Sequence, residues 1–351
     1  MATCFSFTAT RDRCNHLYFS AAGLRSVTVN LSGDTTVRCW VPSRPSPAKP
    51  KLLLIHGFGA NATWQWTPHI RPLLRAGFDL YVPDLLFFGG SFTSLPARSD
   101  SFQAETLMSF MESIGVERFG LVGVSYGGFV GYRMAAMYPE AVERLVLCCT
   151  GVCLEERDLE EGLFVVRDVN EAASILLPQT PDRLRRLVSL SFVKPPPAIP
   201  SWFLADYIHV MCTDYLQEKT ELIHELIKHR RVSDLPKINQ PTLIVWGEQD
   251  QIFPLELGYR LKRHLGENSQ LVIIKEAGHA VNLEKAREFY KHIIAFMLDS
   301  SSKSKSKSKA TMWHRISSSF RSLSLKNFAP NHPLLSGEKT AKDDSLNPFA
   351  S

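Results

Sequence analysis

The sequence lacks the long apolar run of a membrane-spanning helix, because no stretch approaches the roughly 18 consecutive apolar residues that such a helix needs. Near its N-terminus it also lacks the uninterrupted apolar segment of a secretory signal. Residues 1–33 are rich in Ser and Thr and carry three arginines with one acid, a composition mildly similar to an organellar transit peptide. We favour residues 1–24 as a short lead-in to the fold, because residues 26–41 already alternate like a β-hairpin.

Cysteines at the spacing of a metal or redox motif are also missing. The seven cysteines are odd in number and none forms a Cys-x-x-Cys pair, the spacing typical of zinc and redox sites. This pattern argues against a disulfide framework and favours reduced, buried cysteines in a cytoplasmic protein, with organellar import as the alternative. His224 and His229 stand five positions apart, about 500° around a helix, so they do not share the helical face that a zinc-binding pair needs. We therefore predict neither a metal nor another cofactor.

Net positive charge is absent outside the C-terminal segment. The chain carries a net charge of +5, and residues 301–351 hold nine Lys and Arg against three Asp and Glu. The rest of the chain is therefore close to neutral, at about −1. No nucleic-acid-binding motif accompanies the basic segment, so we predict no polynucleotide partner.

The same segment, residues 300–351, has the Ser/Lys repeats of a disordered tail. Within residues 303–328, four apolar residues recur at spacings of three, four and three: Trp313, Ile316, Phe320 and Leu323. Basic residues lie among them, and a basic amphipathic helix can bind an anionic membrane surface reversibly. Both interpretations stand at this point, a solvated tail and a peripheral membrane contact.

Short buried strands alternate with helices through most of the chain. We predict strands at residues 51–55, 78–82, 118–124, 143–149, 242–246 and 270–275. This alternation is typical of an α/β fold with a mostly parallel sheet covered by helices on both faces. Residues 152–235 interrupt it, with helices predicted at 155–166, 170–177, 181–191 and 201–229 and no strand. The two halves of the core are then residues 25–151 and 236–299.

One predicted strand runs into the sequence Gly123-Val124-Ser125-Tyr126-Gly127. Gly-x-Ser-x-Gly at a sharp turn from strand to helix exposes the serine hydroxyl, and the flanking glycines leave room for the strained backbone. The following helix directs its first free N–H groups to the place where negative charge would develop. A neutral serine is a poor nucleophile without a base, so the candidate nucleophile Ser125 requires partners elsewhere in the chain.

Those partners follow other predicted strands. His56-Gly57-Phe58-Gly59 follows the first strand, and the N–H groups of Phe58 and Tyr126 are the candidate oxyanion hole. Asp250 and His279 follow the last two strands. In these positions His279 would take the proton of Ser125, and Asp250 would orient His279. Glu248 is the neighbouring alternative for the acid.

Together these stretches resemble the α/β-hydrolase superfamily over residues 25–298. The resemblance rests on five stretches: HGFG at 56–59, the aspartate Asp84, GVSYGG at 123–128, WGEQDQIFP at 246–254 and AGHAVNLEKA at 277–286. It implies the α/β-hydrolase fold, a helical cap inserted at residues 152–235, and Asp250 as the acid. Many relatives have Gly-x-Gly after the aspartate, whereas this chain has Leu85-Leu86-Phe87-Phe88 there, a difference that concerns the pocket entrance.

The resemblance also implies an activity. The chain is similar to capped carboxylesterases and monoacylglycerol-lipase-type members, which implies a small lipophilic ester as substrate. It is similar as well to carbon–carbon hydrolases that cleave ring-fission products. A slow-turnover ligand receptor of the same fold is a further alternative, although GVSYGG and the cap sequence do not match that group. Three large residues of the implied cap, Trp202, Phe203 and Tyr207, either line a lipophilic pocket or form the cap's own core.

Overall fold

The computed structural model describes residues 6–32, 34–196 and 199–299 of the 351-residue chain. The C-terminal segment, including residues 303–328, lies outside these ranges. None of the helices within the described residues combines the length and the apolarity needed to cross a membrane.

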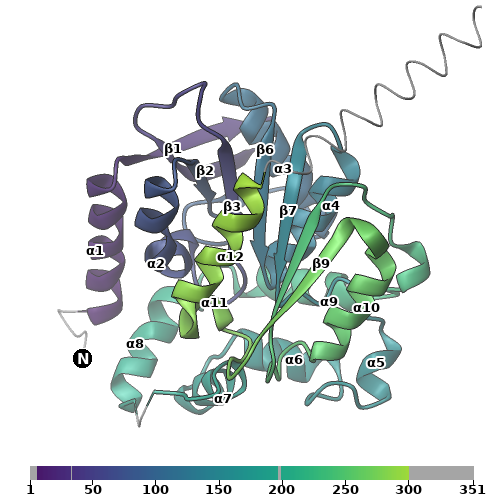
Figure 1. Ribbon diagram of the computed structural model, residues 1–351. Coiled ribbons are helices and arrows are strands. Elements are labelled where there is room, and N and C mark those ends of the chain that lie inside the picture. Colours follow the sequence, from purple (N-terminus) through teal and green to yellow (C-terminus); the bar gives the residue numbers. More distant parts are fainter. Residues whose placement is uncertain (1–5, 33, 197–198, 300–351) are drawn as a thin grey trace, which may run out of the picture. The chain divides into compact units, whose positions relative to one another are not determined.

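The described residues contain a nine-stranded sheet in the order β1-β2-β4-β3-β6-β7-β8-β9, with β5 paired to β2 (Figure 1). Its strands are β1 Leu24–Leu31, β2 Thr35–Pro42, β3 Lys51–Ile55, β4 Asp79–Pro83, β5 Phe92–Thr93, β6 Phe119–Val124, β7 Val142–Cys148, β8 Thr242–Gly247 and β9 Ser269–Ile274. β1 and β2 form the antiparallel hairpin predicted for residues 26–41. From β4 to β9 along the sheet the strands are parallel, which confirms the predicted architecture.

The register of the parallel strands aligns their carboxyl ends. Ile55 of β3 pairs with Gly123 of β6, and Cys148 of β7 pairs with both Val124 and Val245. Loops that leave these strands therefore meet at one edge of the sheet, which is where ligands bind in sheets of this kind. β6 is buried along its whole length, so its apolar residues anchor this edge in the core.

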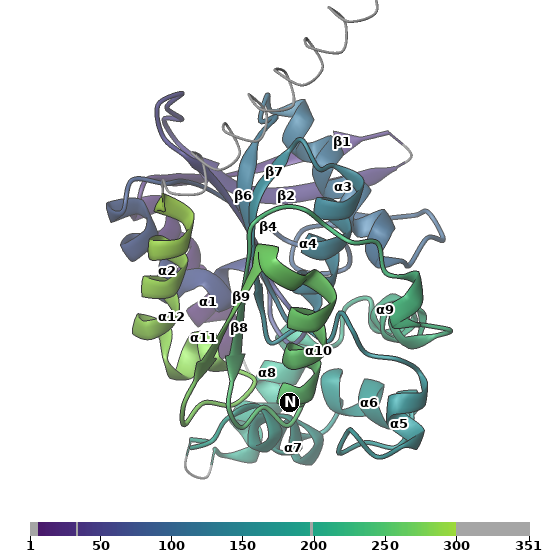
Figure 2. The same ribbon diagram turned by 45° about the vertical axis from the view of Figure 1, so that its right-hand side comes forward.

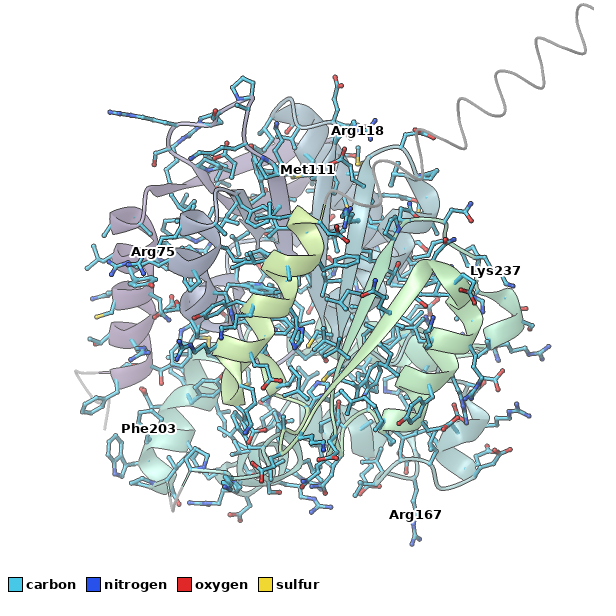
Figure 3. All side chains as sticks on the ribbon, in the orientation of Figure 1. Arg75, Met111, Arg118, Arg167, Phe203 and Lys237 are labelled. Carbon is cyan, nitrogen blue, oxygen red and sulfur yellow. The ribbon has the colours of Figure 1, made fainter. Side chains whose placement is uncertain are left out.

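Helices cover both faces of the sheet. Figures 1 and 2 show α1, α2 and α12 on one face, and α3, α4 and α10 on the other. The bounds of these and the short α11 are α1 Phe7–Ala21, α2 Ala62–Arg75, α3 Asp100–Ser113, α4 Tyr126–Met137, α10 Leu255–Leu265, α11 Val281–Glu284 and α12 Ala286–Leu298. In Figure 3 the side chains of Arg118, Arg167 and Lys237 project outward, whereas Met111 of α3 lies inside and is fully buried.

The described part of residues 152–235 contains helices and no strand. Its α-helices are α5 Arg157–Glu160, α6 Val169–Leu176, α7 Pro181–Ser191, α8 Ser201–Met211 and α9 Leu216–Ile227. Figure 1 shows α6, α7 and α8 beyond the carboxyl edge of the parallel strands. They therefore lie over the edge where the loops meet.

Two predicted helices in this region are wrong in extent. The helix predicted over 155–166 is helical only at Arg157–Glu160, and the chain turns at Gly162 with φ +77°. The helix predicted over 201–229 is two helices, α8 and α9, because Tyr215 adopts a left-handed backbone with φ +53° between them. Such a conformation ends a helix, and the apolar spacing on either side does not reveal it.

The N-terminal residues form a helix, α1, that the sequence pattern did not indicate. Ser6 caps it by accepting a hydrogen bond from the Ala9 N–H. Its apolar residues do not make a single stripe, since Leu17 is exposed while the polar Thr8 and Asn15 are buried. The Thr8 N–H donates to Asp206 of α8 at 2.8 Å, so the helix also packs at the carboxyl edge.

Candidate active site

Ser125 lies in a strained turn between β6 and α4. Its backbone has φ +53° and ψ −121°, which is uncommon for a residue with a side chain. Two hydrogen bonds hold the turn: the Ser125 N–H donates to the Cys148 carbonyl at 2.8 Å, and its own carbonyl accepts from the Gly128 N–H at 2.9 Å. The surrounding sheet and helix therefore compensate for the strain and keep the hydroxyl at the carboxyl edge.

The glycines beside Ser125 are required by close backbone contacts. A Cβ atom at Gly123 would collide with the backbone of Gly127 and Gly128, in the first turn of α4. A Cβ atom at Gly127 would collide with the carbonyl groups of Ile55 and His56. The Gly-x-Ser-x-Gly pattern thus allows α4 to approach both β6 and the end of β3.

A chain of hydrogen bonds links the three predicted triad residues. Ser125 Oγ lies 2.9 Å from His279 Nε2, and His279 Nδ1 lies 2.9 Å from Asp250 Oδ2. The second carboxylate oxygen of Asp250 accepts from the N–H groups of Ile252 and Phe253 at 2.9 and 2.8 Å. Because the carboxylate accepts from Nδ1–H, His279 takes the tautomer whose Nε2 accepts the Ser125 proton.

Glu248, the alternative acid, lies elsewhere. Its side chain is exposed, and its Oε2 accepts a hydrogen bond from the Glu276 N–H at 3.3 Å. The side chain of Asp250, by contrast, is fully buried against His279, whose side chain is 13 % exposed. The geometry therefore pairs the imidazole with Asp250.

The two predicted oxyanion donors are free to bind a ligand. The Phe58 N–H makes no hydrogen bond among the described residues. Tyr126 is the first residue of α4, so its N–H has no carbonyl one turn earlier in the helix. The rings of these two residues are 4.8 Å apart, which brings the loop after β3 against the start of α4.

Two buried side chains hold the loop that carries Phe58. His56 Nδ1 hydrogen-bonds the Gly57 carbonyl at 2.8 Å, and Nε2 accepts from the Leu85 N–H at 3.0 Å. Burial lowers the pKa of His56, which keeps this neutral, bridging tautomer. Gln65 Oε1 accepts from the Gly57 N–H at 2.8 Å. The sequence reasoning missed Gln65, and its place in a helix carries no motif that indicates this role.

The loop after Asp84 packs behind the same segment. Asp84 accepts hydrogen bonds from Arg38 Nε at 2.7 Å and from the Ala62 N–H at 3.0 Å. The Phe88 ring lies 5.2 Å from the rings of both His56 and Phe58. Where many relatives have Gly-x-Gly, this chain therefore places an aromatic side chain against the oxyanion loop.

Two cavities meet at Ser125. The smaller, of about 70 Å³, is lined by apolar side chains from α4, α6, α9 and the loop after Asp250, including Phe129, Ala172, Ile223 and Phe253. The larger, of about 360 Å³, lies among α2, α7 and α8 and includes Gln65, Val188, Phe203, Leu204 and His279. Phe58, Ser125 and Leu176 line both cavities. Among the residues that the structure describes, neither lining contains a lysine, an arginine or an acidic residue.

The three residues predicted to bind substrate lie in different environments in the structure. Phe203 and Tyr207 line the larger cavity, and the Tyr207 hydroxyl donates to the Gly59 carbonyl. Trp202 is 59 % exposed and absent from the lining of both cavities, and its ring lies 5.4 Å from that of Phe7 in α1. Trp202 thus packs between α8 and α1 at the surface.

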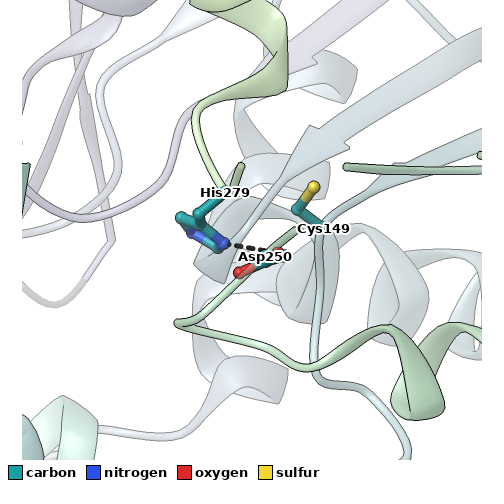
Figure 4. A group of neighbouring side chains, drawn as sticks. All are labelled: Cys149, Asp250 and His279. Atoms are coloured by element: carbon teal, nitrogen blue, oxygen red, sulfur yellow. Dashed lines mark hydrogen bonds and ion pairs between the residues drawn. The ribbon is translucent and has the colours of Figure 1, made fainter. Parts of the chain in front are cut away.

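The described residues also include a group that offers three atoms suited to metal binding. Figure 4 shows Cys149 beside Asp250 and His279, and their ligand atoms lie within 4.8 Å of one another. The Asp250–His279 hydrogen bond already engages a nitrogen and an oxygen of this group. Burial raises the pKa of the Cys149 thiol well above its usual range, so the thiol is protonated and poorly suited to metal binding. The arrangement suits proton transfer rather than a metal.

Comparisons with known proteins find similarity to hydrolases and a lipase. Mouse monoacylglycerol lipase ABHD6 is 29 % identical over 262 residues, covering 71 % of this chain and 76 % of the mouse protein. A Pseudomonas 2-hydroxy-6-oxononadienedioate/2-hydroxy-6-oxononatrienedioate hydrolase is 24 % identical, over 70 % of this chain and 87 % of its own. The crystal structure of a membrane phospholipase A, a bacterial virulence factor, aligns with a TM-score of 0.67 and 28 % identity, over 83 % of this chain and 90 % of that one.

The family model for the alpha/beta hydrolase fold matches residues 50–286, which span both halves of the sheet and the helical region between them. The match includes the turn at Ser125. It also includes His279, which hydrogen-bonds Ser125, and Asp250, which hydrogen-bonds His279. The chain is therefore a hydrolase that belongs to the alpha/beta hydrolase fold family.

Proposed function

We propose that this protein is a serine hydrolase that cleaves carboxylic esters of lipophilic acyl groups, such as monoacylglycerols. The observation that carries the proposal is the hydrogen-bonded line from Ser125 through His279 to Asp250, beside two free backbone N–H groups. Acyl transfer needs this combination of a nucleophile, a base, an orienting acid and an oxyanion hole. The apolar linings beside Ser125 support a lipophilic substrate.

The reaction follows from the positions of these groups. Ser125 Oγ attacks the ester carbonyl carbon while His279 Nε2 takes the hydroxyl proton. The N–H groups of Phe58 and Tyr126 stabilise the oxyanion, and Asp250 stabilises the imidazolium. His279 then donates its proton to the leaving alcohol. Water hydrolyses the resulting acyl-enzyme by the same steps in reverse order.

We also propose that residues 152–235 act as a cap over this site. Side chains from α6 and α9 line the smaller cavity, and side chains from α7 and α8 line the larger one. An enclosing layer of this kind excludes water and surrounds the lipophilic parts of the substrate.

The cavity linings favour an ester over a carbon–carbon bond of a ring-fission product. The products of aromatic ring fission carry carboxylates, and the described part of the chain places no lysine or arginine in either cavity to pair with them. A slow-turnover receptor of this fold would retain the same hydrogen-bonded triad, so the rate of ester turnover distinguishes it from an esterase.

Fluorophosphonate labelling and ester turnover test the proposal together. We expect the wild-type protein to be labelled at Ser125 and to hydrolyse p-nitrophenyl esters and monoacylglycerols. Folded Ser125→Ala protein should lose both properties. Labelling without useful turnover of any ester would instead identify a receptor, and near wild-type turnover by Ser125→Ala would end the serine-hydrolase proposal.

A further inference from the structure

The two cavities differ in which side of the reaction centre they reach. His279 lines the larger cavity but not the smaller, whereas Tyr126, a proposed oxyanion donor, lines the smaller but not the larger. The ring of Phe253 lies 5.5 Å from the imidazole and belongs to the lining of the smaller cavity. Phe253 thus borders the imidazole on one side and lines the smaller cavity.

Proton transfer decides which part of an ester enters which cavity. The leaving oxygen has to lie within hydrogen-bond reach of His279 Nε2, because that nitrogen returns the proton to it. The group bonded to this oxygen therefore extends on the imidazole side of Ser125, into the larger cavity. The acyl chain, on the opposite side of the carbonyl carbon, extends toward Tyr126 and the smaller cavity.

We propose that the smaller cavity binds the acyl chain and the larger cavity binds the alcohol, so that this enzyme is built for esters of bulky, mostly apolar alcohols. The inference rests on the proposed ester hydrolysis. Its basis is the difference in volume, about 70 Å³ against about 360 Å³, with the larger space on the leaving-group side. The inference narrows the proposed substrate class, because glycerol, the alcohol of a monoacylglycerol, would leave most of the larger cavity empty and a bulkier alcohol would fill it.

Gln65 adds a polar contact on the alcohol side. Its Oε1 accepts from the Gly57 N–H, which fixes the amide orientation, and its Nε2 makes no hydrogen bond among the described residues. Gln65 is 9 % exposed and lines the larger cavity. Its amide therefore presents an unpaired donor beside Gly57, which lies so close to Ser125 that an added Cβ atom would collide with the serine side chain. An alcohol with a hydroxyl or ether oxygen close to the ester bond would satisfy this donor.

Two matched variants test the assignment. Ala172→Phe places a phenyl ring in the smaller cavity and Val188→Phe places one in the larger, and both sites are partly exposed helix positions. Each is assayed on p-nitrophenyl esters of increasing acyl length and on butyrate esters of increasingly bulky alcohols. We expect Ala172→Phe to lower kcat/KM about tenfold for long acyl chains only, and Val188→Phe to do so for bulky alcohols only.

The reversed pattern would overturn the assignment, and so would equal effects of both variants on both series. Absence of turnover of every ester by the wild-type enzyme would be a different result, because it would refute the underlying ester hydrolysis. Thermal unfolding of both variants, matched to the wild type, separates altered selectivity from damage to the fold.

The wild-type enzyme supplies a test that needs no variant. In alcoholysis an added alcohol attacks the acyl-enzyme, His279 takes its proton and returns it to Ser125, and a new ester forms. Because this is the reverse of alcohol release, the added alcohol has to occupy the leaving-group cavity. We expect 1-octanol to capture the acyl-enzyme at least tenfold better than ethanol at equal concentration. Equal capture would overturn the proposal.

The role of Gln65 is tested by the ratio of the kcat/KM values that one enzyme shows for two esters. Esters of 1-octanol and of 1,2-octanediol differ by one hydroxyl next to the ester bond. We expect the wild type to prefer the hydroxylated ester about fivefold to tenfold, and Gln65→Leu to show no preference. General damage to the oxyanion loop cancels in this ratio, so an unchanged preference in Gln65→Leu would remove Gln65 from alcohol recognition.

Discussion

Replacing Asp250 by Asn tests the link between the buried carboxylate and the imidazole. In the wild type one carboxylate oxygen accepts from the Ile252 and Phe253 N–H groups, and the other accepts from His279 Nδ1–H. An amide has only one acceptor oxygen. If that oxygen faced His279, the amide NH₂ would face two buried N–H donors, at a cost of roughly 2–6 kcal/mol.

In the Asp250→Asn variant the amide oxygen therefore stays with the two backbone donors, and the NH₂ faces the imidazole. His279 has to shift its proton to Nε2, so that Nδ1 accepts from the amide. The imidazole then donates to Ser125 Oγ and no longer accepts its proton. We expect kcat/KM for a p-nitrophenyl ester to fall roughly 10⁴-fold, or about 5 kcal/mol of transition-state stabilisation, with KM little changed.

Nitrogen chemical shifts of His279 would report the tautomer directly, and the protein should remain folded. Glu248→Gln is the matched control, since its exposed side chain should leave kcat/KM within about twofold. A loss of kcat/KM below tenfold in Asp250→Asn would refute the reasoning. A large loss of kcat/KM in Glu248→Gln would refute it too, and would assign the acid role to Glu248.

Three further predictions concern buried and exposed groups. Burial lowers the pKa of His69 to about 4, so the unfolded chain takes up this proton first and stability should fall as the pH drops from about 6.5 toward 4. His69→Phe should recover about 2 kcal/mol of that loss at pH 5 in chemical denaturation, and equal acid sensitivity of both proteins would contradict this. Phe203→Ala should change the preference among ester alcohols about tenfold, whereas Trp202→Ala should change only the melting temperature; identical selectivity profiles would count against Phe203 as a pocket residue. If residues 303–328 bind anionic membranes, the full chain should sediment with anionic liposomes in a salt-sensitive way and a chain ending at Ser300 should not; equal sedimentation would leave the solvated tail.

Much of the fold could be predicted because its signals are local. Each strand of the parallel sheet is a short apolar run, and burial on both faces requires such a run whatever the neighbours are. The turn at Ser125 is also a local matter, since only glycine at positions 123 and 127 admits the approach of α4. Helix breaks such as that at Tyr215, and the helix α1, lack such a signal because packing with distant segments decides them.

The sequence by itself determined which residues follow the ends of the strands, and hence that Ser125, Asp250 and His279 share one edge of the sheet. Only the tertiary structure decided how they meet, because Ser125 and His279 are 154 positions apart and their 2.9 Å contact depends on the register of the strands between them. The contact of Gln65 with Gly57, the exposure of Trp202 and the two unequal cavities likewise arise from packing between α2, α8 and the helices beyond the sheet. No periodicity along the chain encodes these features, because each depends on the shapes of side chains that distant segments bring together.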